Sequence, residues 1–217
     1  MLRFAEEVML LLLHDENGRF ERVPDWSLGY ALGGGVLMDL ALENRIDTDL
    51  DNLILVDDTP LGDSLLDPTL ADIAAAEDKR DARFWVERTA GRADEIREEA
   101  LSRLVHSGIL EEQEDRFLWV FRSRRYPLVD GTAEREVKLR IMEVLFSDEI
   151  PDPRDVVIIC LADACALFRQ LLSKQELERA SKRIEQVTRL DLIGQAMSQA
   201  IRDIQLSIAL LSQPHTY

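Results

Sequence analysis

Apolar residues recur at the three- and four-residue spacing of an α-helix through most of this 217-residue chain. The first such segment, Phe4 to Leu13, ends at a polar turn, and a second begins near Asp25 or Ser27 and continues through Leu42. This spacing predicts a mainly α-helical fold. Further helices are predicted at residues 67–76, 80–88, 91–106, 131–146, 152–172, 175–188 and 190–211, with Asp67 as an N-cap before Pro68.

We expect one domain, a helical bundle over residues 1–212 with a frayed tail at 213–217. Only 7 Pro and 10 Gly are spread along the chain, so no flexible linker separates a second unit. Short β-hairpins are predicted at residues 45–58 and again after the helix stop at Ser107 and Gly108, where residues 117–121 read as a strand. Gly33, Gly34 and Gly35 lie inside a predicted helix, which indicates close approach of another backbone or a ligand.

The segment from Arg116 to Arg125 reverses the charge of the chain locally. The formal net charge is −16, yet this segment holds four arginines and no carboxylate around five large apolar residues. An apolar strand rimmed with guanidinium groups suits an anionic membrane, because the rings can enter the interface while the guanidinium groups meet lipid phosphates. An ordinary buried strand beside a basic loop would have the same sequence, so both interpretations stay open.

No constellation of residues points to catalysis or to a metal site. None of the three histidines has a ligand partner three or four residues away, and no phosphate-binding loop or nucleophile turn occurs. The 42 acidic against 26 basic side chains argue against a nucleic-acid partner. A winged-helix DNA binder is also disfavoured, because its recognition helix at 91–106 would carry four carboxylates.

Two cysteines and one apolar run bear on the cellular setting. Cys160 and Cys165 are five residues apart in a predicted helix, so they point to different faces and read as small buried residues rather than a disulfide. The run from Val156 to Leu172 is too short to span a bilayer. Any membrane contact is therefore expected at the surface of the protein.

A tryptophan and three arginines are candidate ligand contacts. Trp26 follows Pro24 at the start of a predicted helix, where its indole either meets a ligand or membrane or staples the helix start to the core. Arg97 lies among acidic neighbours, which favours salt bridges. Arg88 and Arg92 flank the turn before that helix and could join Arg97 in a small basic pocket.

Six segments occur in the order and spacing of a known family. They are EEVMLLLLHD at 6–15, LGGGVLMDLAL at 32–42, GDSLLD at 62–67, LVHSGIL at 104–110, PL at 127–128 and LADAC at 161–165. By their ordered combination the chain resembles the Golgi phosphoprotein 3 family from about Leu2 to Leu211. The short amino-terminal segment makes it similar to a compact, bacterial type of member.

The resemblance implies a mostly α-helical fold with a protruding hairpin, no enzymatic activity, no cofactor, and peripheral binding to phosphatidylinositol 4-phosphate in membranes. Golgi members also hold cytosolic tails of glycosyltransferases. The family's head-group pocket uses a tryptophan and several arginines, of which Trp26 and Arg97 match two. Two other arginine positions fall on Gly33 and Asp94. The family's hairpin, used for self-association and membrane contact, falls on residues 113–124.

We therefore expect a non-enzymatic, cytoplasmic protein that binds anionic phospholipid at the membrane surface and adapts membrane-protein tails. The alternative is a lipid-independent scaffold that forms homo-oligomers through its hairpin. The expected head-group residues are Trp26, Arg97, Arg88 and Arg92. The expected hairpin contacts are Phe117, Trp119, Phe121, Arg122, Arg124 and Arg125.

Overall fold

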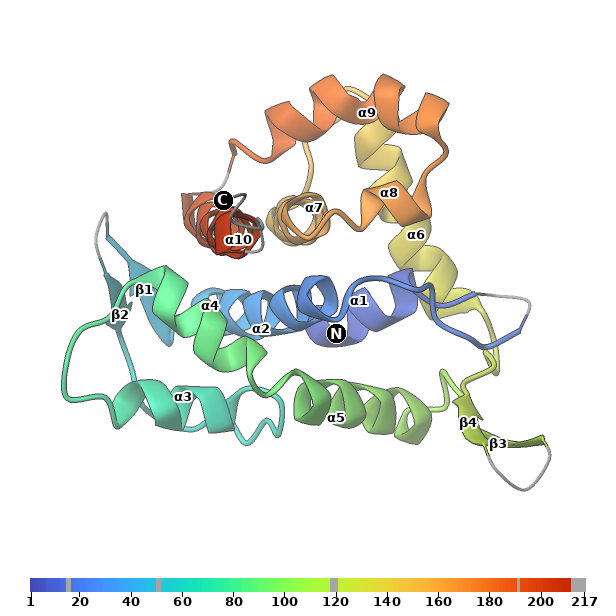
Figure 1. Cartoon of the computed structure of the whole chain (residues 1–217), viewed down its shortest axis with the longest axis horizontal. Helices are drawn as coiled ribbons and strands as arrows, with labels where there is room; N and C mark the ends of the chain where they lie inside the picture. The colour runs from blue at the N-terminus through green and yellow to red at the C-terminus, as the bar shows by residue number, and fades with distance from the viewer. Residues whose placement is uncertain (15–16, 50–51, 118–120, 191, 212–217) are drawn as a thin grey trace, which may run out of the picture.

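The structure is a computed structural model that describes residues 1–14, 17–49, 52–117, 121–190 and 192–211. In these ranges it contains ten helices and two two-stranded sheets, which confirms the mainly α-helical prediction. Two central helices, α1 (Phe4–Leu11) and α2 (Asp25–Leu42), lie between two groups of helices (Figure 1). One group contains α3 (Asp67–Ala74), α4 (Ala82–Ala90) and α5 (Ala93–His106), and the other contains α6 (Thr132–Phe146), α7 (Pro153–Ala164), α8 (Phe168–Leu171), α9 (Lys174–Val187) and α10 (Leu192–Leu211).

The central position of α2 depends on its three consecutive glycines, each of which faces a different helix. A Cβ atom on Gly33 would lie 2.8 Å from the backbone nitrogen of Ala90 at the end of α4. On Gly34 it would lie 2.8 Å from Cδ2 of Leu161 in α7, and on Gly35 3.1 Å from Cβ of Phe4 in α1. The predicted close approach of another backbone is therefore confirmed at Gly33, and the triplet lets α2 pack on three sides.

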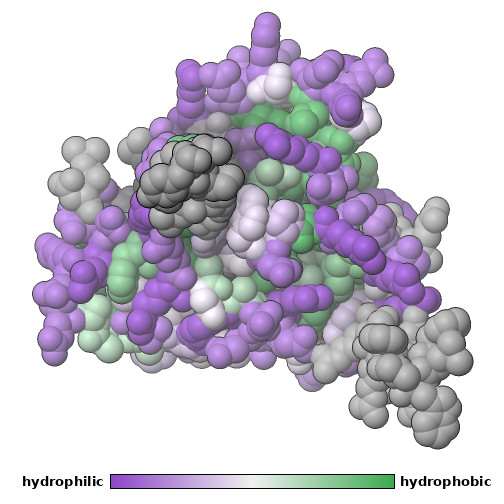
Figure 2. All heavy atoms as spheres, in the orientation of Figure 1, coloured by the Kyte–Doolittle hydropathy of each residue, from purple (hydrophilic) through white to green (hydrophobic). Residues whose placement is uncertain are grey.

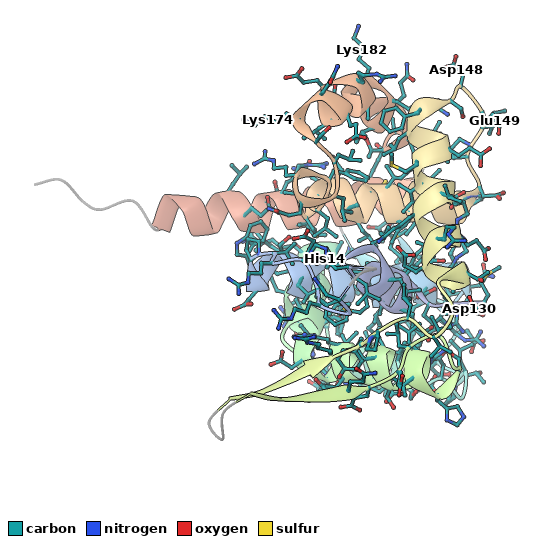
Figure 3. All side chains as sticks on the ribbon, turned by 90° about the vertical axis from the view of Figure 1, so that its right-hand side faces the viewer. His14, Asp130, Asp148, Glu149, Lys174 and Lys182 are labelled. Carbon is teal, nitrogen blue, oxygen red and sulfur yellow. The ribbon has the colours of Figure 1, made fainter. Side chains whose placement is uncertain are left out.

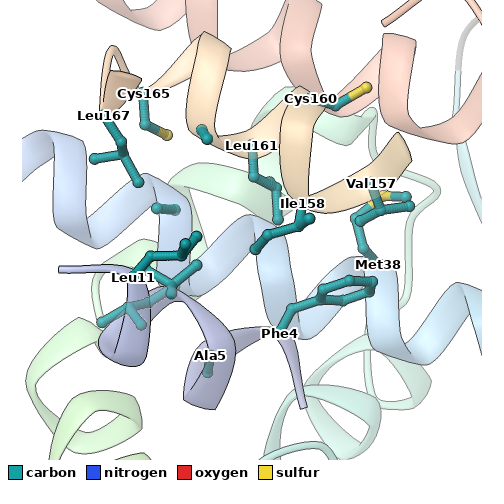
Figure 4. Close-up of a cluster of buried hydrophobic side chains, with 14 of the residues drawn as sticks. Phe4, Ala5, Leu11, Met38, Val157, Ile158, Cys160, Leu161, Cys165 and Leu167 are labelled. Carbon is teal, nitrogen blue, oxygen red and sulfur yellow. The ribbon is translucent and has the colours of Figure 1, made fainter. Parts of the chain in front are cut away.

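The main core cluster is apolar and joins both groups of helices. Figure 4 shows Phe4 and Leu11 of α1, Met38 of α2, and Ile158 and Leu161 of α7 meeting in one cluster. Each of these side chains is at most 3% exposed, so each contributes roughly 1.5–3 kcal/mol through burial. Hydrophilic residues cover most of the face in Figure 2, as expected for a protein that keeps its apolar residues inside.

The helix predicted at residues 152–172 is wrong in one respect, because it is two helices. Ala166 has a φ of 57°, and the amide of Leu167 donates to the carbonyl of Ala162, which ends α7 with a left-handed turn. Left-handed turns are usually formed by glycine and only rarely by alanine. Because alanine occupies this position, nothing in the sequence indicated the break. Within the described ranges no helix has both the length and the apolar character needed to cross a membrane.

A second correction concerns Asp67, which is not the N-cap of α3. Leu66 occupies that position. The Asp67 carboxylate instead accepts hydrogen bonds from the backbone amides of Leu61 at 2.8 Å and Asp63 at 3.1 Å. It therefore closes the loop before the helix, while Pro68 occupies the first turn as predicted.

Both predicted hairpins are present. The strands β1 (Ile46–Thr48) and β2 (Leu53–Leu55) form one, and β3 (Gln113–Phe117) and β4 (Phe121–Arg125) form the other. The single strand predicted at 117–121 is wrong, because Phe117 ends β3 and its antiparallel partner Phe121 begins β4. Figure 3 shows β3 and β4 extending away from the helices, which confirms a protruding hairpin.

The two cysteines are buried, as predicted. Cys160 and Cys165 are free thiols, each 1% exposed, in α7 and at its C-terminal end. Burial raises the pKa of the Cys165 thiol far above its usual value, with a further increase from the nearby Asp163 carboxylate. A thiol held neutral in this way is a poor nucleophile, so Cys165 acts as a packing residue.

Candidate functional site

Trp26 lies in the first turn of α2, where the backbone carbonyl of Pro24 accepts from the amides of Ser27 and Leu28. Its side chain remains 40% exposed, and its ring centroid is 6.3 Å from that of Tyr30, one turn further along. The indole is therefore supported on one side and open to solvent on another. This is the arrangement expected of a contact residue rather than of a side chain buried in the core.

The N-terminal half of α2 packs on the junction between α4 and α5. A Cβ atom on Gly29 would lie 3.6 Å from Cβ of Ala93, the first residue of α5, and Gly33 contacts Ala90. Trp26 precedes Gly29 by three residues, so helical spacing places it on the same face, toward the start of α5. This face of α2 is thus turned toward the junction of α4 and α5, where Arg92 directly precedes α5 and Arg97 lies within it.

Arg97 has no carboxylate partner among the residues that the structure describes. Its guanidinium carbon lies 5.7 Å from the centre of the Phe20 ring, and its Nε is buried without a hydrogen-bond acceptor. Within the ranges that the structure describes, Arg97 forms no ion pair, although Asp94, Glu95 and Glu98 are near it in sequence. The salt bridges expected for it are therefore not seen there.

The other two predicted arginines already have carboxylate partners. Arg88 pairs with Asp72 at 3.3 Å, and Arg92 pairs with Glu95 at 3.0 Å. Both pairs are substantially exposed, and exposed pairs contribute only about 0–1 kcal/mol, so an anionic ligand could compete with these carboxylates. The structure thus separates Arg97, which is unpaired within the described part of the chain, from two weaker candidates.

The structure also explains one of the two departures from the family's arginine positions. A side chain at position 33 is excluded, because even a Cβ atom there would lie 2.8 Å from the Ala90 nitrogen. Asp94 is different, since it is exposed on the first turn of α5 and its position can accommodate a long side chain. The packing of α2 on α4 therefore rules out a guanidinium at position 33 in this chain.

The backbones of β3 and β4 pair in a defined antiparallel register. Phe117 pairs with Phe121, Arg116 with Arg122, and Gln113 with Arg125. This register pairs two antiparallel strands across the basic segment that the sequence singles out. Trp119, predicted to join Phe117 and Phe121, lies outside the described residues.

Sequence reasoning missed a buried ion-pair network beneath α1. Four arginines, Arg3, Arg103, Arg140 and Arg154, are each paired with at least two carboxylates. A carboxylate inside an otherwise apolar helical segment is the signal that could have found it. The carboxylates are Glu6, Glu7, Asp39, Glu43, Asp63 and Asp155.

Asp39 shows the cost of this network most clearly. Its carboxylate accepts from the amide of Phe4 at 2.7 Å and pairs with Arg154 at 3.4 Å, yet it is 1% exposed. Burial raises the pKa of Asp39 to about 6, against the lowering effects of Phe4, Arg154 and Arg3. The network therefore needs every guanidinium to keep its carboxylates charged in the interior.

The helical fold and the protruding β3–β4 hairpin define a class of mainly α-helical domains with a projecting hairpin. A family model described as "Golgi phosphoprotein 3 (GPP34)" matches residues 4–204. The chain belongs to this family.

A curated relative supports the same assignment. The chain is 25% identical over 216 residues to "Vacuolar protein sorting-associated protein 74" of Eremothecium gossypii. The match covers 83% of this chain and 64% of the relative, so the chain spans about two thirds of the length of that protein.

Proposed function

We propose that this protein is a cytoplasmic, non-enzymatic adaptor that binds anionic lipid head groups of the phosphatidylinositol 4-phosphate type at a membrane surface. Membership of the Golgi phosphoprotein 3 family supports this proposal, as does similarity to a relative named for vacuolar protein sorting. Tails of membrane proteins are the proposed clients. The observation that carries the lipid proposal is Arg97, a partly exposed arginine that has no ion-pair partner within the described part of the chain.

The chemistry of a phosphate monoester fits this surface. A guanidinium offers several N–H donors to phosphate oxygens, and charge-assisted hydrogen bonds of this kind contribute roughly 1.5–3 kcal/mol each. Trp26, 40% exposed, can lie beside the ring or glycerol of the lipid. Arg88 and Arg92 are secondary contacts that exchange Asp72 and Glu95 for phosphate.

The net charge of −16 sets a condition on binding. A strongly acidic body is repelled by an anionic membrane, so attraction must come from a local basic surface that approaches the lipid closely. The protruding β3–β4 hairpin, with arginines at positions 116, 122, 124 and 125, is the proposed second contact. Binding is therefore expected to weaken as ionic strength rises.

Changing Arg97→Glu is expected to lower affinity for vesicles containing phosphatidylinositol 4-phosphate by at least about tenfold, because one charge-assisted contact is lost and a repulsion is added. Sedimentation with vesicles of phosphatidylcholine alone, with phosphatidylserine, and with phosphatidylinositol 4-phosphate measures this. Wild-type protein should pellet most with the phosphoinositide. Trp26→Ala should weaken the same binding.

The matched control is Arg189→Glu, which changes the net charge by the same amount at an exposed position just after α9. Its effect should stay within about threefold, since an exposed pair contributes little. Equal pelleting of wild type with neutral and anionic vesicles would refute the lipid proposal. Equal losses for the two variants would show that only overall charge matters.

A second candidate function is a lipid-independent scaffold, favoured by the free edges of the hairpin. Strands β3 and β4 form a sheet of only two strands, so each has one edge without a β-partner within the described chain. Such an edge can pair with another copy. The double variant Trp119→Ala with Arg124→Glu tests this.

We expect the double variant to lose vesicle binding while its mass by sedimentation velocity equals that of wild type. A fall from oligomer to monomer without any change in vesicle binding would favour the scaffold instead. Circular dichroism should show unchanged helix content, because the hairpin lies outside the helical core.

A further inference from the structure

The loop between α1 and α2 packs against the base of the β3–β4 hairpin. The amide of Tyr126, the first residue after β4, donates to the carbonyl of Gly18 at 2.8 Å. Gly18 has a φ of 62°, and a Cβ atom there would lie 2.5 Å from the backbone nitrogen of Pro127. Glycine suits both this conformation and so close an approach, so the loop and the end of the hairpin are in direct backbone contact.

Phe20, two residues further along the same loop, connects Tyr126 to Arg97. The ring centroids of Phe20 and Tyr126 are 5.8 Å apart, and the two ring planes are tilted by 49°. The guanidinium carbon of Arg97 lies 5.7 Å from the centre of the Phe20 ring. Both distances are those of favourable aromatic and cation–π contacts. A continuous series of contacts therefore runs from Arg97 on α5, through Phe20, to the base of the hairpin.

The residues in the middle of this series are held in place. Phe20 is partly buried against the main core, and Tyr126 is 4% exposed. The amide of Glu21, next to Phe20, donates to the carbonyl of Leu12 at 2.7 Å, which attaches the loop to the end of α1. Packed side chains of this kind do not reorient without displacing their neighbours. A movement of Tyr126 must therefore displace Phe20, and with it the ring against which Arg97 rests.

Each strand of the hairpin has its own attachment at the base. On the β3 side, Ile109 and Leu110 connect the strand to the end of α5, and Leu110 forms an antiparallel bridge with Leu128. The amide of Glu111 donates to the carbonyl of Pro127 at 2.9 Å. On the β4 side, the attachment is the α1–α2 loop described above. Because the hairpin projects from the helices (Figure 3), a small rotation at its base moves its far end by much more, so these attachments decide where it points.

We propose that Phe20 is a positioning residue that holds Arg97 and the β3–β4 hairpin in a fixed relative arrangement, so that both meet one membrane surface together. The inference rests on the proposed lipid function for the roles of Arg97 and the hairpin. Two contacts that are fixed relative to each other bind a surface more tightly than two contacts that move independently, because less conformational freedom is lost on binding. Phe20 itself does not need to touch the lipid.

Amide hydrogen exchange of the lipid-free protein, resolved by residue with NMR, tests the link directly. Phe20→Leu keeps an apolar side chain but removes the ring from both neighbours. We expect the amides of Tyr126 and of β4 to exchange about tenfold faster in this variant, while those of α7 in the core stay unchanged. Arg97→Gln removes the cation from the other side of the ring and should accelerate the same amides about threefold.

The matched control is Phe84→Leu on α4. Phe84 also carries an arginine over its ring, that of Arg80 at 5.1 Å, and it contacts the ring of Trp85 at 5.2 Å. The substitution therefore removes the same two kinds of contact at a site outside the series that leads to the hairpin. Hydrogen exchange of β4 should not change in this variant.

Vesicle binding then tests what the link does. With vesicles of phosphatidylcholine and phosphatidylinositol 4-phosphate, Phe20→Leu should lower the affinity about tenfold. In an Arg97→Gln background the same substitution should lower it less than twofold, because no head-group contact is left to align with the hairpin. Losses that simply add, or affinity unchanged by Phe20→Leu, would overturn the positioning role.

The outcomes separate this inference from the lipid function on which it rests. Unchanged hairpin exchange in Phe20→Leu, or equal acceleration throughout α7, would overturn the inference even if the wild-type protein binds the phosphoinositide vesicles. Faster hairpin exchange in a protein that does not bind these vesicles would support the link between Phe20 and the hairpin but refute the lipid function.

Discussion

Replacing Arg140 with alanine is expected to destabilise the fold by about 3 kcal/mol. Arg140 donates to Glu7 at 3.1 Å and to Asp155, and these carboxylates are 2% and 4% exposed. Without the guanidinium, Asp155 loses its ion-pair partner, and Glu7 keeps only Arg154 at 3.5 Å. A buried carboxylate without its partner costs far more than an exposed pair contributes. Urea unfolding followed by circular dichroism measures the change.

The control for this prediction is Arg189→Ala, which breaks an exposed pair with Glu185 and should cost less than about 1 kcal/mol. Arg140→Met separates charge from packing, because it keeps an aliphatic stem, and it should remain strongly destabilising. Combining it with Glu7→Gln and Asp155→Asn should recover part of the loss by removing the stranded charges. If Arg140→Ala were as mild as Arg189→Ala, the network would not be supporting α1, α6 and α7.

The second large effect is expected in the glycine triplet of α2, where the three single alanine variants should destabilise the fold to different extents. Gly33→Ala places a Cβ atom 2.8 Å from the backbone of Ala90, so α4 must move, at a cost of about 1–3 kcal/mol. The gain in helix propensity, about 1 kcal/mol, offsets only part of this cost. Gly34→Ala meets only the flexible end of Leu161, which can turn aside. Gly35→Ala, at 3.1 Å from Cβ of Phe4, should fall between them.

Thermal and urea unfolding of the three variants test this order. Gly33→Arg, which introduces the residue type that the family resemblance expects at this position, should be the most destabilising of the series. Because α2 packs on α4 at Gly33, displacement of α4 should also disturb the helix that carries Trp26, so Gly33→Ala should weaken vesicle binding. If Gly33→Ala proved as stable as Gly34→Ala, the α2–α4 approach would be looser than the structure indicates.

Much of the fold could be predicted from the sequence, because local rules decide where helices begin and end. Asp25–Leu42 and the helix ending at His106 follow from apolar spacing and from the Ser107–Gly108 stop. The break at Ala166 could not be predicted, because its left-handed turn is formed by alanine without a glycine signal. Asp67 was assigned as a cap from its position, but its carboxylate binds backbone amides of the preceding loop.

The candidate sites were less accessible to sequence reasoning. Trp26 and Arg97 were both predicted as ligand contacts from the sequence. The acidic neighbours of Arg97, however, suggested that it would form an ion pair, as Arg92 does with Glu95. Only the three-dimensional arrangement showed its guanidinium beside Phe20 with a buried Nε donor left over. A cavity lined by α1, α5 and α6 was not foreseen either, because its lining residues come from four separate segments of the chain.

By itself, the amino-acid sequence determined the helical class, the two hairpins, the local basic segment and the family resemblance, because these depend on spacing and on residues close together in the chain. The tertiary structure alone decided which charges are paired. Ion pairs such as Arg3 with Asp63 and Arg140 with Glu7 join residues 60 and 133 positions apart. Whether a given arginine is left to bind a ligand depends on those distant partners, and therefore on how the helices pack.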